Sequence, residues 1–337
     1  MDTEGYIKAG IFGVITGDAL GVPVEFQPRE RLKANPVTDM REYGTHRQPK
    51  GTWSDDSSMM LATLDSMIDC RGIQYDDIMG KFVLWRKKGK YTPYGEVFDI
   101  GLTCADAIDR YGRGFMPLKC GGTGERDNGN GSLMRIMPIS LFYCLKEDFW
   151  DEFRLEKAVM NTHAVSCLTH GHPRSQMACM IYTAICHELA FRGERSVLEA
   201  VQTAVSNIMD YYAKAKGNKD WCDRLYEWEI DADTYKRIKD LSSFSNLPEE
   251  EIKSSGYVVH TLEAAIWCLL NSESFTECVL KAVNLGGDTD TVGAVAGGLA
   301  GLCYGYESIP CEWVEALALR EWIDGLCTGF SELLLAE

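Results

Sequence analysis

The stretch WSDDS places a hydroxyl and two adjacent carboxylates, Ser54, Asp55 and Asp56, directly before the apolar run SSMMLATLDSMIDC. One explanation is a helix cap, because serine favours the N-cap position and acidic residues in a first turn face the positive end of the helix dipole. The same side chains are also the hard oxygen ligands that Mg²⁺ and Mn²⁺ prefer. This first acidic cluster is therefore either a helix cap or one half of a metal site.

A second acidic cluster of the same composition lies far along the chain in GGDTDT, where Asp288, Asp290 and Thr291 precede a Gly- and Ala-rich run. Asp288 and Asp290 would point away from each other on a helix, so they converge only in a turn before it. Gly286 and Gly287 supply the backbone freedom for such a turn. Capping explains this cluster too. If the two clusters meet, four carboxylates and two hydroxyls suffice for a two-metal site that activates water.

A glycine-rich stretch, DNGNGSLMRIMP, contains Gly129, Asn130, Gly131 and Ser132. It lacks the Gly-Lys-Ser/Thr of a P-loop, and the preceding residues lack the GxGxxG spacing of a dinucleotide-binding loop. A glycine loop before an apolar run offers free backbone N–H groups to a phosphate. The alternative is a plain tight turn.

Histidines are crowded in the stretch NTHAVSCLTHGHPRSQM, which also holds Cys167. No second cysteine pair closes a zinc site there, and His170 and His172 cannot share one helix face. We therefore interpret His170 as a ligand-binding or core hydrogen-bonding residue.

Helical periodicity dominates the elements that must position these residues, and few alternating runs indicate strands. We predict an all-α fold, a compact orthogonal helical bundle in a single domain over residues 1–337. The Gly- and Ala-rich run after Asp290 allows close packing of helix backbones. The charged and aromatic segment around residues 211–255 is interpreted as a helical insertion, either a surface helix pair or a cap over a site.

The composition restricts the partners of this chain. Its 337 residues carry a formal net charge of -16, which disfavours nucleic acid and anionic membranes as partners. A polyanionic substrate would need a local positive charge, which a bound metal ion supplies. The 13 cysteines form no CxxC pair and are interpreted as buried residues in a reducing compartment. The acidic N-terminus is unlike a signal peptide, and no apolar run is judged long enough to cross a bilayer, so we expect a cytoplasmic protein.

Taken together, these motifs resemble the ADP-ribosylglycohydrolase family, which includes the dinitrogenase-reductase-activating glycohydrolase. The combination of WSDDS with GGDTDT is specific, and the matching stretches follow the family's order over most of the chain. These stretches are GDALGVPVEF (17–26), GTWSDDSS (51–58), GNGSLMR (129–135), THGHP (169–173), GYVVHTLEAAIW (256–267) and GGDTDTVGAVAGGLAG (286–301).

The resemblance implies an all-α fold that binds two Mg²⁺ or Mn²⁺ ions. The implied metal ligands are Ser54, Asp55, Asp56, Asp288, Asp290 and Thr291. Ser54 and Ser57 stand where many members have threonine, and either hydroxyl offers an oxygen ligand. Asp18 is expected to hold the end of the first helix against the site.

The implied reaction is hydrolysis at the anomeric carbon of the distal ribose of ADP-ribose. The metal ions would bind the ribose hydroxyls and an attacking water, and a carboxylate would take the proton. The candidates for this catalytic role are Asp55, Asp56 and Glu25, and Glu25 would gate the site or orient the water.

The resemblance also implies how the substrate is bound. The stretch Gly129, Asn130, Gly131 and Ser132 would cradle the diphosphate. His170 would contact the diphosphate or the distal ribose, and Tyr257 would pack against the nucleoside.

We therefore predict a metal-dependent enzyme that removes ADP-ribose from a modified protein side chain. One alternative is a hydrolase of a free ADP-ribose derivative or of ADP-ribosylated nucleic acid. A second alternative is a relative that binds ADP-ribose without turnover.

Overall fold

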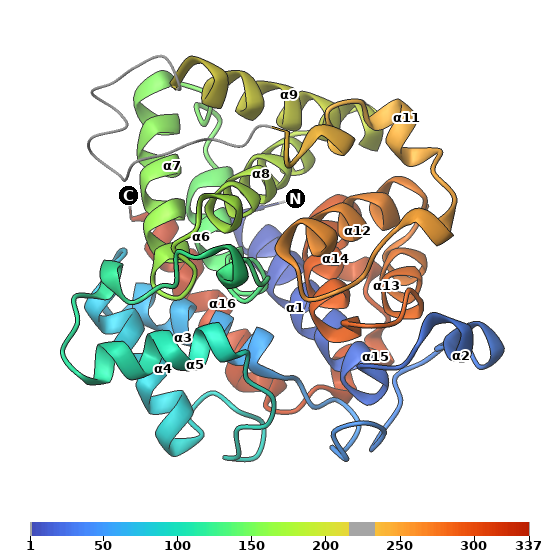
Figure 1. Cartoon of the computed structure of the whole chain (residues 1–337), viewed down its shortest axis with the longest axis horizontal. Coiled ribbons are helices and arrows are strands. Elements are labelled where there is room, and N and C mark those ends of the chain that lie inside the picture. The colour runs from blue at the N-terminus through green and yellow to red at the C-terminus, as the bar shows by residue number, and fades with distance from the viewer. Residues whose placement is uncertain (1, 216–232, 337) are drawn as a thin grey trace.

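The computed structural model describes residues 2–215 and 233–336 and builds them from helices and loops (Figure 1). No β-strand forms in these two ranges, where only three isolated β-bridges occur, so the all-α prediction is confirmed. The α-helices are α1 (Thr3–Gly21), α2 (Arg29–Ala34), α3 (Asp55–Asp69), α4 (Tyr75–Lys88), α5 (Leu102–Gly112), α6 (Met137–Cys144), α7 (Glu152–Cys167), α8 (Pro173–Ala190), α9 (Val197–Ala215), α11 (Leu241–Ser245), α12 (Val258–Leu270), α13 (Phe275–Asn284), α14 (Thr289–Tyr304), α15 (Cys311–Ala316) and α16 (Arg320–Leu335).

Helices α1 and α14, from opposite ends of the chain, pack side by side in the middle of the molecule (Figure 1). A Cβ atom on Gly17 would overlap the carbonyl oxygen of Gly293, and one on Gly13 would overlap that of Gly297. The two backbones are therefore in direct contact along a seam that side chains larger than hydrogen would open. This glycine seam brings the start of α14 beside the end of α1.

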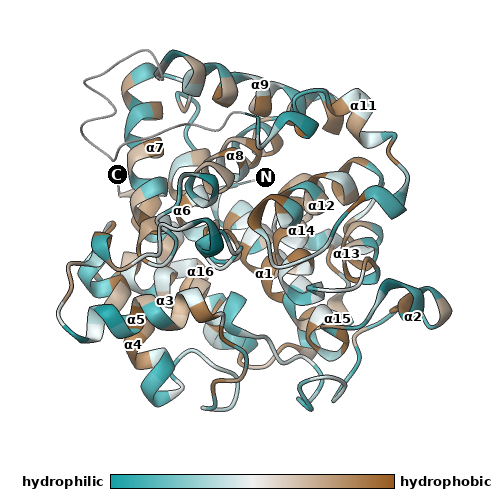
Figure 2. Ribbon diagram, viewed as in Figure 1, coloured by the Kyte–Doolittle hydropathy of each residue, from teal (hydrophilic) through white to brown (hydrophobic). Residues whose placement is uncertain are grey.

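Helix α1 is apolar because it lies in the core. The stretch Thr3–Val24 is long and apolar enough to cross a membrane, so the sequence-based judgement that no run reaches that length was wrong. However, 94% of an 18-residue window within this stretch is buried inside the protein itself, which is typical of a core helix. Figure 2 shows that the central helices differ from the outer ones, with mainly hydrophobic residues on α1 and α14 and more hydrophilic residues on outer helices such as α4.

The remaining helices enclose this central pair. Helices α12 and α13 pack against α14, helices α3 and α16 pack against α1, and α8 joins α6, α7 and α9 to the centre. The cysteines in the described residues are unpaired, and most of them are buried, as the sequence indicated. Part of the predicted insertion or cap, residues 216–232, lies outside the described residues; α9 precedes it and α11 follows it.

The glycine seam generates a test of the fold. Gly17→Ala should lower the free energy of unfolding by about 2–3 kcal/mol, because the added methyl group forces two helix backbones apart. Gly80, in the middle of α4, has open space around the position of a Cβ atom and is the matched control. Gly80→Ala should raise the free energy of unfolding by up to about 1 kcal/mol. Denaturant titration of both variants measures the difference, and a Gly17→Ala variant as stable as wild type would contradict the seam.

Candidate active site

The two acidic clusters meet where α3 and α14 begin. Asp55 and Asp56 form the first turn of α3, while Asp290 and Thr291 lie in the first turn of α14. The hydroxyl of Thr291 lies 3.4 Å from the carboxylate of Asp56 and donates to it. Two segments far apart in the sequence thus place their carboxylates at one point.

Asp18 of α1 fixes the position of α3. Its carboxylate accepts hydrogen bonds from the backbone N–H of Ser54 at 3.0 Å, from the N–H of Ser57 at 3.1 Å and from the Ser57 hydroxyl at 2.6 Å. Burial raises the pKa of Asp18 to about 6, although these hydrogen bonds lower it. Asp18 therefore ties the N-terminus of α3 to the central helix, as expected from the sequence.

Helix capping explains one cluster and not the other. The Ser54 hydroxyl accepts a hydrogen bond from the N–H of Asp56 at 3.3 Å, so the predicted cap of α3 is present. Asp288 occupies the N-cap position of α14, but its side chain makes no capping hydrogen bond. It accepts instead from the side-chain amide of Asn130 at 2.8 Å. The second cluster needs another reason for its acidic residues.

The meeting point is rich in buried negative charge. Asp55, Asp56 and Asp290 are at most 5% exposed, and burial raises the pKa of each well above its usual range, with further increases from neighbouring carboxylates. One oxygen of Asp56 and one of Asp290 are buried without a hydrogen-bond partner. Leaving such atoms unpaired is costly, and a hard divalent cation is the partner that carboxylate oxygens fit. The residues present therefore suit a metal site.

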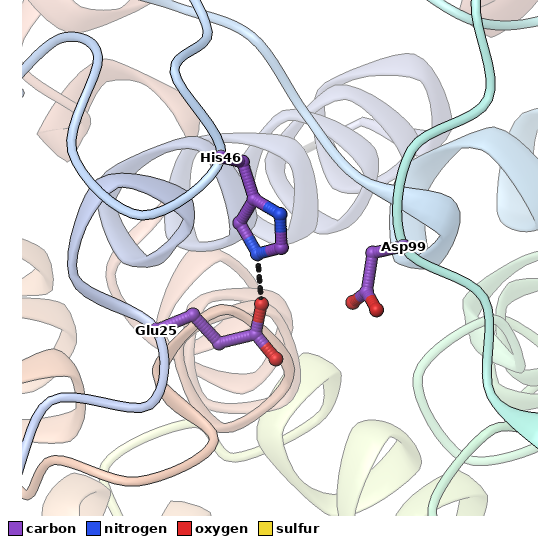
Figure 3. A group of neighbouring side chains, drawn as sticks. All are labelled: Glu25, His46 and Asp99. Atoms are coloured by element: carbon purple, nitrogen blue, oxygen red, sulfur yellow. Dashed lines mark hydrogen bonds and ion pairs between the residues drawn. The ribbon is translucent and has the colours of Figure 1, made fainter.

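Glu25 joins these carboxylates to a second group of side chains. One of its carboxylate oxygens lies within 4.8 Å of oxygens of Asp288 and Asp290, and it also neighbours His46 and Asp99. Figure 3 shows the Glu25 carboxylate hydrogen-bonded to His46 Nε2, with Asp99 approaching from the opposite side. Burial raises the pKa of Glu25 to about 7, the hydrogen bond from His46 opposes this shift, and Asp99 and Asp288 add to it.

The loop that carries Glu25 is held on two sides. The N–H of Phe26 donates to the carbonyl of Gly287 at 2.7 Å, next to Asp288 in the second cluster. On the other side, the Thr45 hydroxyl donates to the carbonyl of Glu25 at 2.8 Å. The turn around Thr45 therefore presents His46 to Glu25.

His46 and Asp99 were not predicted from the sequence. Both lie in irregular loops, where no spacing rule places a side chain relative to a distant glutamate.

The carboxylates form one wall of an open pocket of about 290 Å³. The glycine loop also lines the pocket, and there a Cβ atom on Gly131 would lie 2.8 Å from the His170 ring and 2.7 Å from Cys104 Sγ. Most of the residues singled out from the sequence line this pocket. They are Glu25, Asp55, Asp56, Gly129, Asn130, Gly131, His170, Asp288 and Thr291.

The other four predicted residues are not among those that line the pocket. Ser54 and Asp290 are buried beneath the carboxylate wall. The Ser132 hydroxyl lies 2.9 Å from the Ser166 hydroxyl in the core, so only its backbone remains for a phosphate. Tyr257 forms a backbone bridge with Gly129 and so supports the glycine loop. Its predicted contact with a nucleoside stays a prediction.

Known proteins share this architecture. A family model described as ADP-ribosylglycohydrolase matches residues 2–336. ADP-ribosylarginine hydrolase Tri1 of Pseudomonas putida (strain GB-1) is 32% identical over 324 residues, which cover 95% of this chain and 76% of that protein. ADP-ribosyl-dinitrogen reductase glycohydrolase of Rhodospirillum rubrum is 29% identical over 321 residues, covering 91% and 88%.

The fold has a solved counterpart as well. The structure of an ADP-ribosylglycohydrolase-related protein complex is similar with a TM-score of 0.74 and 30% sequence identity, covering 98% of this chain and 99% of that one. The match of family model, relatives and fold over nearly the whole chain shows that this protein belongs to the ADP-ribosylglycohydrolase family, whose enzymes hydrolyse glycosidic bonds of ADP-ribose.

Proposed function

We propose that this enzyme is a metal-dependent hydrolase that releases ADP-ribose from modified arginine side chains of proteins. The observation that carries the proposal is the meeting of two acidic helix starts, with buried oxygens of Asp56 and Asp290 left unpaired, beside a glycine loop. The cysteine pattern further supports a cytoplasmic location, and the net charge of -16 makes nucleic acid an unsuitable substrate.

The metal site would use ligands from both clusters. These ligands are Ser54, Asp55, Asp56, Asp288, Asp290 and Thr291. Two Mg²⁺ or Mn²⁺ ions held there would supply positive charge for the ribose hydroxyls and would lower the pKa of a bound water. This charge also allows a strongly acidic protein to hold a diphosphate.

The glycine loop would bind the diphosphate. Gly129 and Gly131 leave room for phosphate oxygens to approach backbone N–H groups, because any side chain at Gly131 would collide with His170. The Asn130 side chain bonds both Asp288 and Thr261, at 2.8 and 2.9 Å, and so holds the loop in register with the carboxylates. The diphosphate and the reacting ribose are thereby placed at a fixed separation.

Glu25 is our candidate for the group that takes the proton from the attacking water. It lines the pocket, and a pKa of about 7 suits a general base at neutral pH. His46 and the Thr45 hydroxyl hold it against the second cluster. Asp55 and Asp56 would then serve as ligands.

The acceptor is proposed to be arginine. Two relatives at 31% and 32% identity are ADP-ribosylarginine hydrolases. The pocket also contains the carboxylate of Asp99 and the side chain of Phe26, which is 65% exposed. A carboxylate and an aromatic ring are favourable neighbours for a guanidinium group.

Release of ADP-ribose from arginine-linked and serine-linked peptides, measured side by side with Mg²⁺ or chelator, tests this function. We expect release from the arginine-linked peptide, only with metal. Asp288→Ala should lower kcat/KM by about a thousandfold, because metal geometry and water activation fail together. Asp210→Ala, on the exposed surface of α9, is the control and should match wild type. If the metal-loaded protein hydrolyses neither peptide and no free ADP-ribose derivative, it binds ADP-ribose without turnover. If it hydrolyses only free ADP-ribose derivatives, its substrate is a small molecule and not a modified protein.

Thermal melting separates metal ligands from helix caps. In chelator, Asp290→Asn should melt at or above wild type, because it removes one of several buried like charges. The pKa of Asp290 is raised in the folded state, so ionisation of this carboxyl group lowers the free energy of unfolding. This loss is absent below the unfolded-state pKa of Asp290 and grows as the pH rises above it. The advantage of Asp290→Asn in chelator should therefore be larger at pH 8 than at pH 5.

Added metal should reverse this order. Mg²⁺ at a hundredfold excess over its Kd should stabilise wild type by about 2.7 kcal/mol and the variant by much less. A wild-type protein whose melting temperature ignores Mg²⁺ and Mn²⁺ would show that the carboxylates are only caps.

The pH dependence of kcat tests how His46 supports Glu25. Removing this hydrogen bond in His46→Ala should raise the pKa of Glu25 further, because burial is then less opposed. The acid limb of the kcat–pH profile should move to higher pH, and kcat at pH 7 should fall about tenfold. His46→Gln retains a side-chain N–H donor, so it should show a smaller shift of the acid limb and a smaller fall in kcat at pH 7 than His46→Ala. An unaltered kcat–pH profile in His46→Ala would show that His46 does not support Glu25 in catalysis.

A further inference from the structure

Arg135, which ends the GNGSLMR stretch, is a fully buried cation that the proposed reaction does not use. No carboxylate within residues 2–215 and 233–336 pairs with it. Its Nη2 donates to the carbonyl of Val165 at 3.0 Å and to the hydroxyl of Thr169 at 2.8 Å, while Nε and Nη1 have no partner. The guanidinium also lies over the ring of Phe82, 4.9 Å from its centroid, but a ring face does not supply the two missing hydrogen-bond acceptors. Burying a charge that lacks a carboxylate partner is expensive, so a structural role alone is a poor explanation for it.

The hydroxyl of Thr169 links Arg135 to His170. Thr169 Oγ1 lies 2.9 Å from His170 Nδ1, and it already accepts a hydrogen bond from the guanidinium. A hydroxyl has one proton to donate, and the guanidinium accepts none. The other neighbour, Cys104, is a protonated thiol, because burial raises its pKa to about 12, and sulfur is a weak acceptor. A second lone pair of Oγ1 could also accept from an Nδ1–H group, but the hydroxyl proton would then have only the thiol sulfur as its acceptor. Donation of this proton to an unprotonated Nδ1 is the stronger arrangement.

The opposite nitrogen of the ring faces the glycine loop. A Cβ atom on Gly129 would lie 3.3 Å from His170 Nε2, and one on Gly131 would lie 3.4 Å from it. Ser166 fixes the backbone of His170 through two hydrogen bonds. The Ser166 carbonyl accepts from the His170 N–H at 2.7 Å, and the Ser166 hydroxyl donates to the His170 carbonyl at 3.0 Å. Burial, together with the charge of Arg135, lowers the pKa of His170 to about 3, which keeps the ring neutral.

We propose that Arg135 and Thr169 are positioning residues that fix His170 as its Nε2–H tautomer, so that a neutral donor faces a phosphate oxygen of ADP-ribose. The ligand part of this proposal rests on the proposed function, and the tautomer part does not. In the other tautomer, the lone pair of Nε2 would face the phosphate oxygen and repel it. The burial of this cation is then explained by the orientation that it imposes on Thr169.

Long-range ¹⁵N–¹H NMR of the histidine rings in the metal-free protein reads the tautomer directly. His170→Gln identifies the His170 signals by their loss. We expect a protonated Nε2 and an unprotonated Nδ1 in wild type and in Thr169→Ser, which keeps the hydroxyl. Thr169→Val, which removes it, should show a mixture or the Nδ1–H form. An Nδ1–H ring in wild type overturns the proposal, and this measurement needs no variant of Arg135 to fold.

Calorimetry with ADP-ribose and Mg²⁺ tests the consequence. Thr169→Val should weaken binding about tenfold, and Thr169→Ser should bind like wild type. In turnover, Thr169→Val should raise KM with little change in kcat. Unchanged affinity in Thr169→Val would overturn the link between tautomer and phosphate. If wild type shows the Nε2–H ring yet binds no ADP-ribose, the proposed function fails and the ligand part of this proposal falls with it.

Discussion

Backbone contact between α1 and α14 is the constraint on which the site depends. Facing glycines let these helices touch, which fixes the start of α14 beside the end of α1. Asp18 lies next to Gly17 of the seam and holds the N-terminus of α3 through three hydrogen-bonded groups. Three helices are thus set in register by one seam and one buried carboxylate. Asp56 and Asp290 meet because of this register and not because of any attraction between them.

The meeting of these carboxylates opposes folding. Burial and mutual repulsion raise the pKa of Asp55, Asp56 and Asp290, so each charge is held where it is unfavourable. The large apolar core, centred on α1 and α14, offsets this cost. A cation turns the same arrangement from a destabilising to a stabilising one. The unpaired oxygens of Asp56 and Asp290 are therefore better explained by a ligand than by the needs of the fold.

The sequence allowed the helices and both acidic clusters to be identified, because helical spacing and hydroxyl–carboxylate motifs are local signals. It did not show that the clusters converge, because this depends on the glycine seam between distant helices. It gave no signal for His46, which a loop brings to Glu25. The side chain of Ser132 turns into the core although its neighbours line the pocket, a difference that no motif records.

Anomalous diffraction from crystals soaked in Mn²⁺ tests the central claim most directly, because it locates the metal without reference to activity. The account predicts two manganese peaks between the first turns of α3 and α14, within ligand distance of the carboxylates of Asp55, Asp56, Asp288 and Asp290. Soaking in chelator should abolish both peaks. Crystals that diffract well, hold no manganese at this point and bind it only at surface carboxylates would contradict the account.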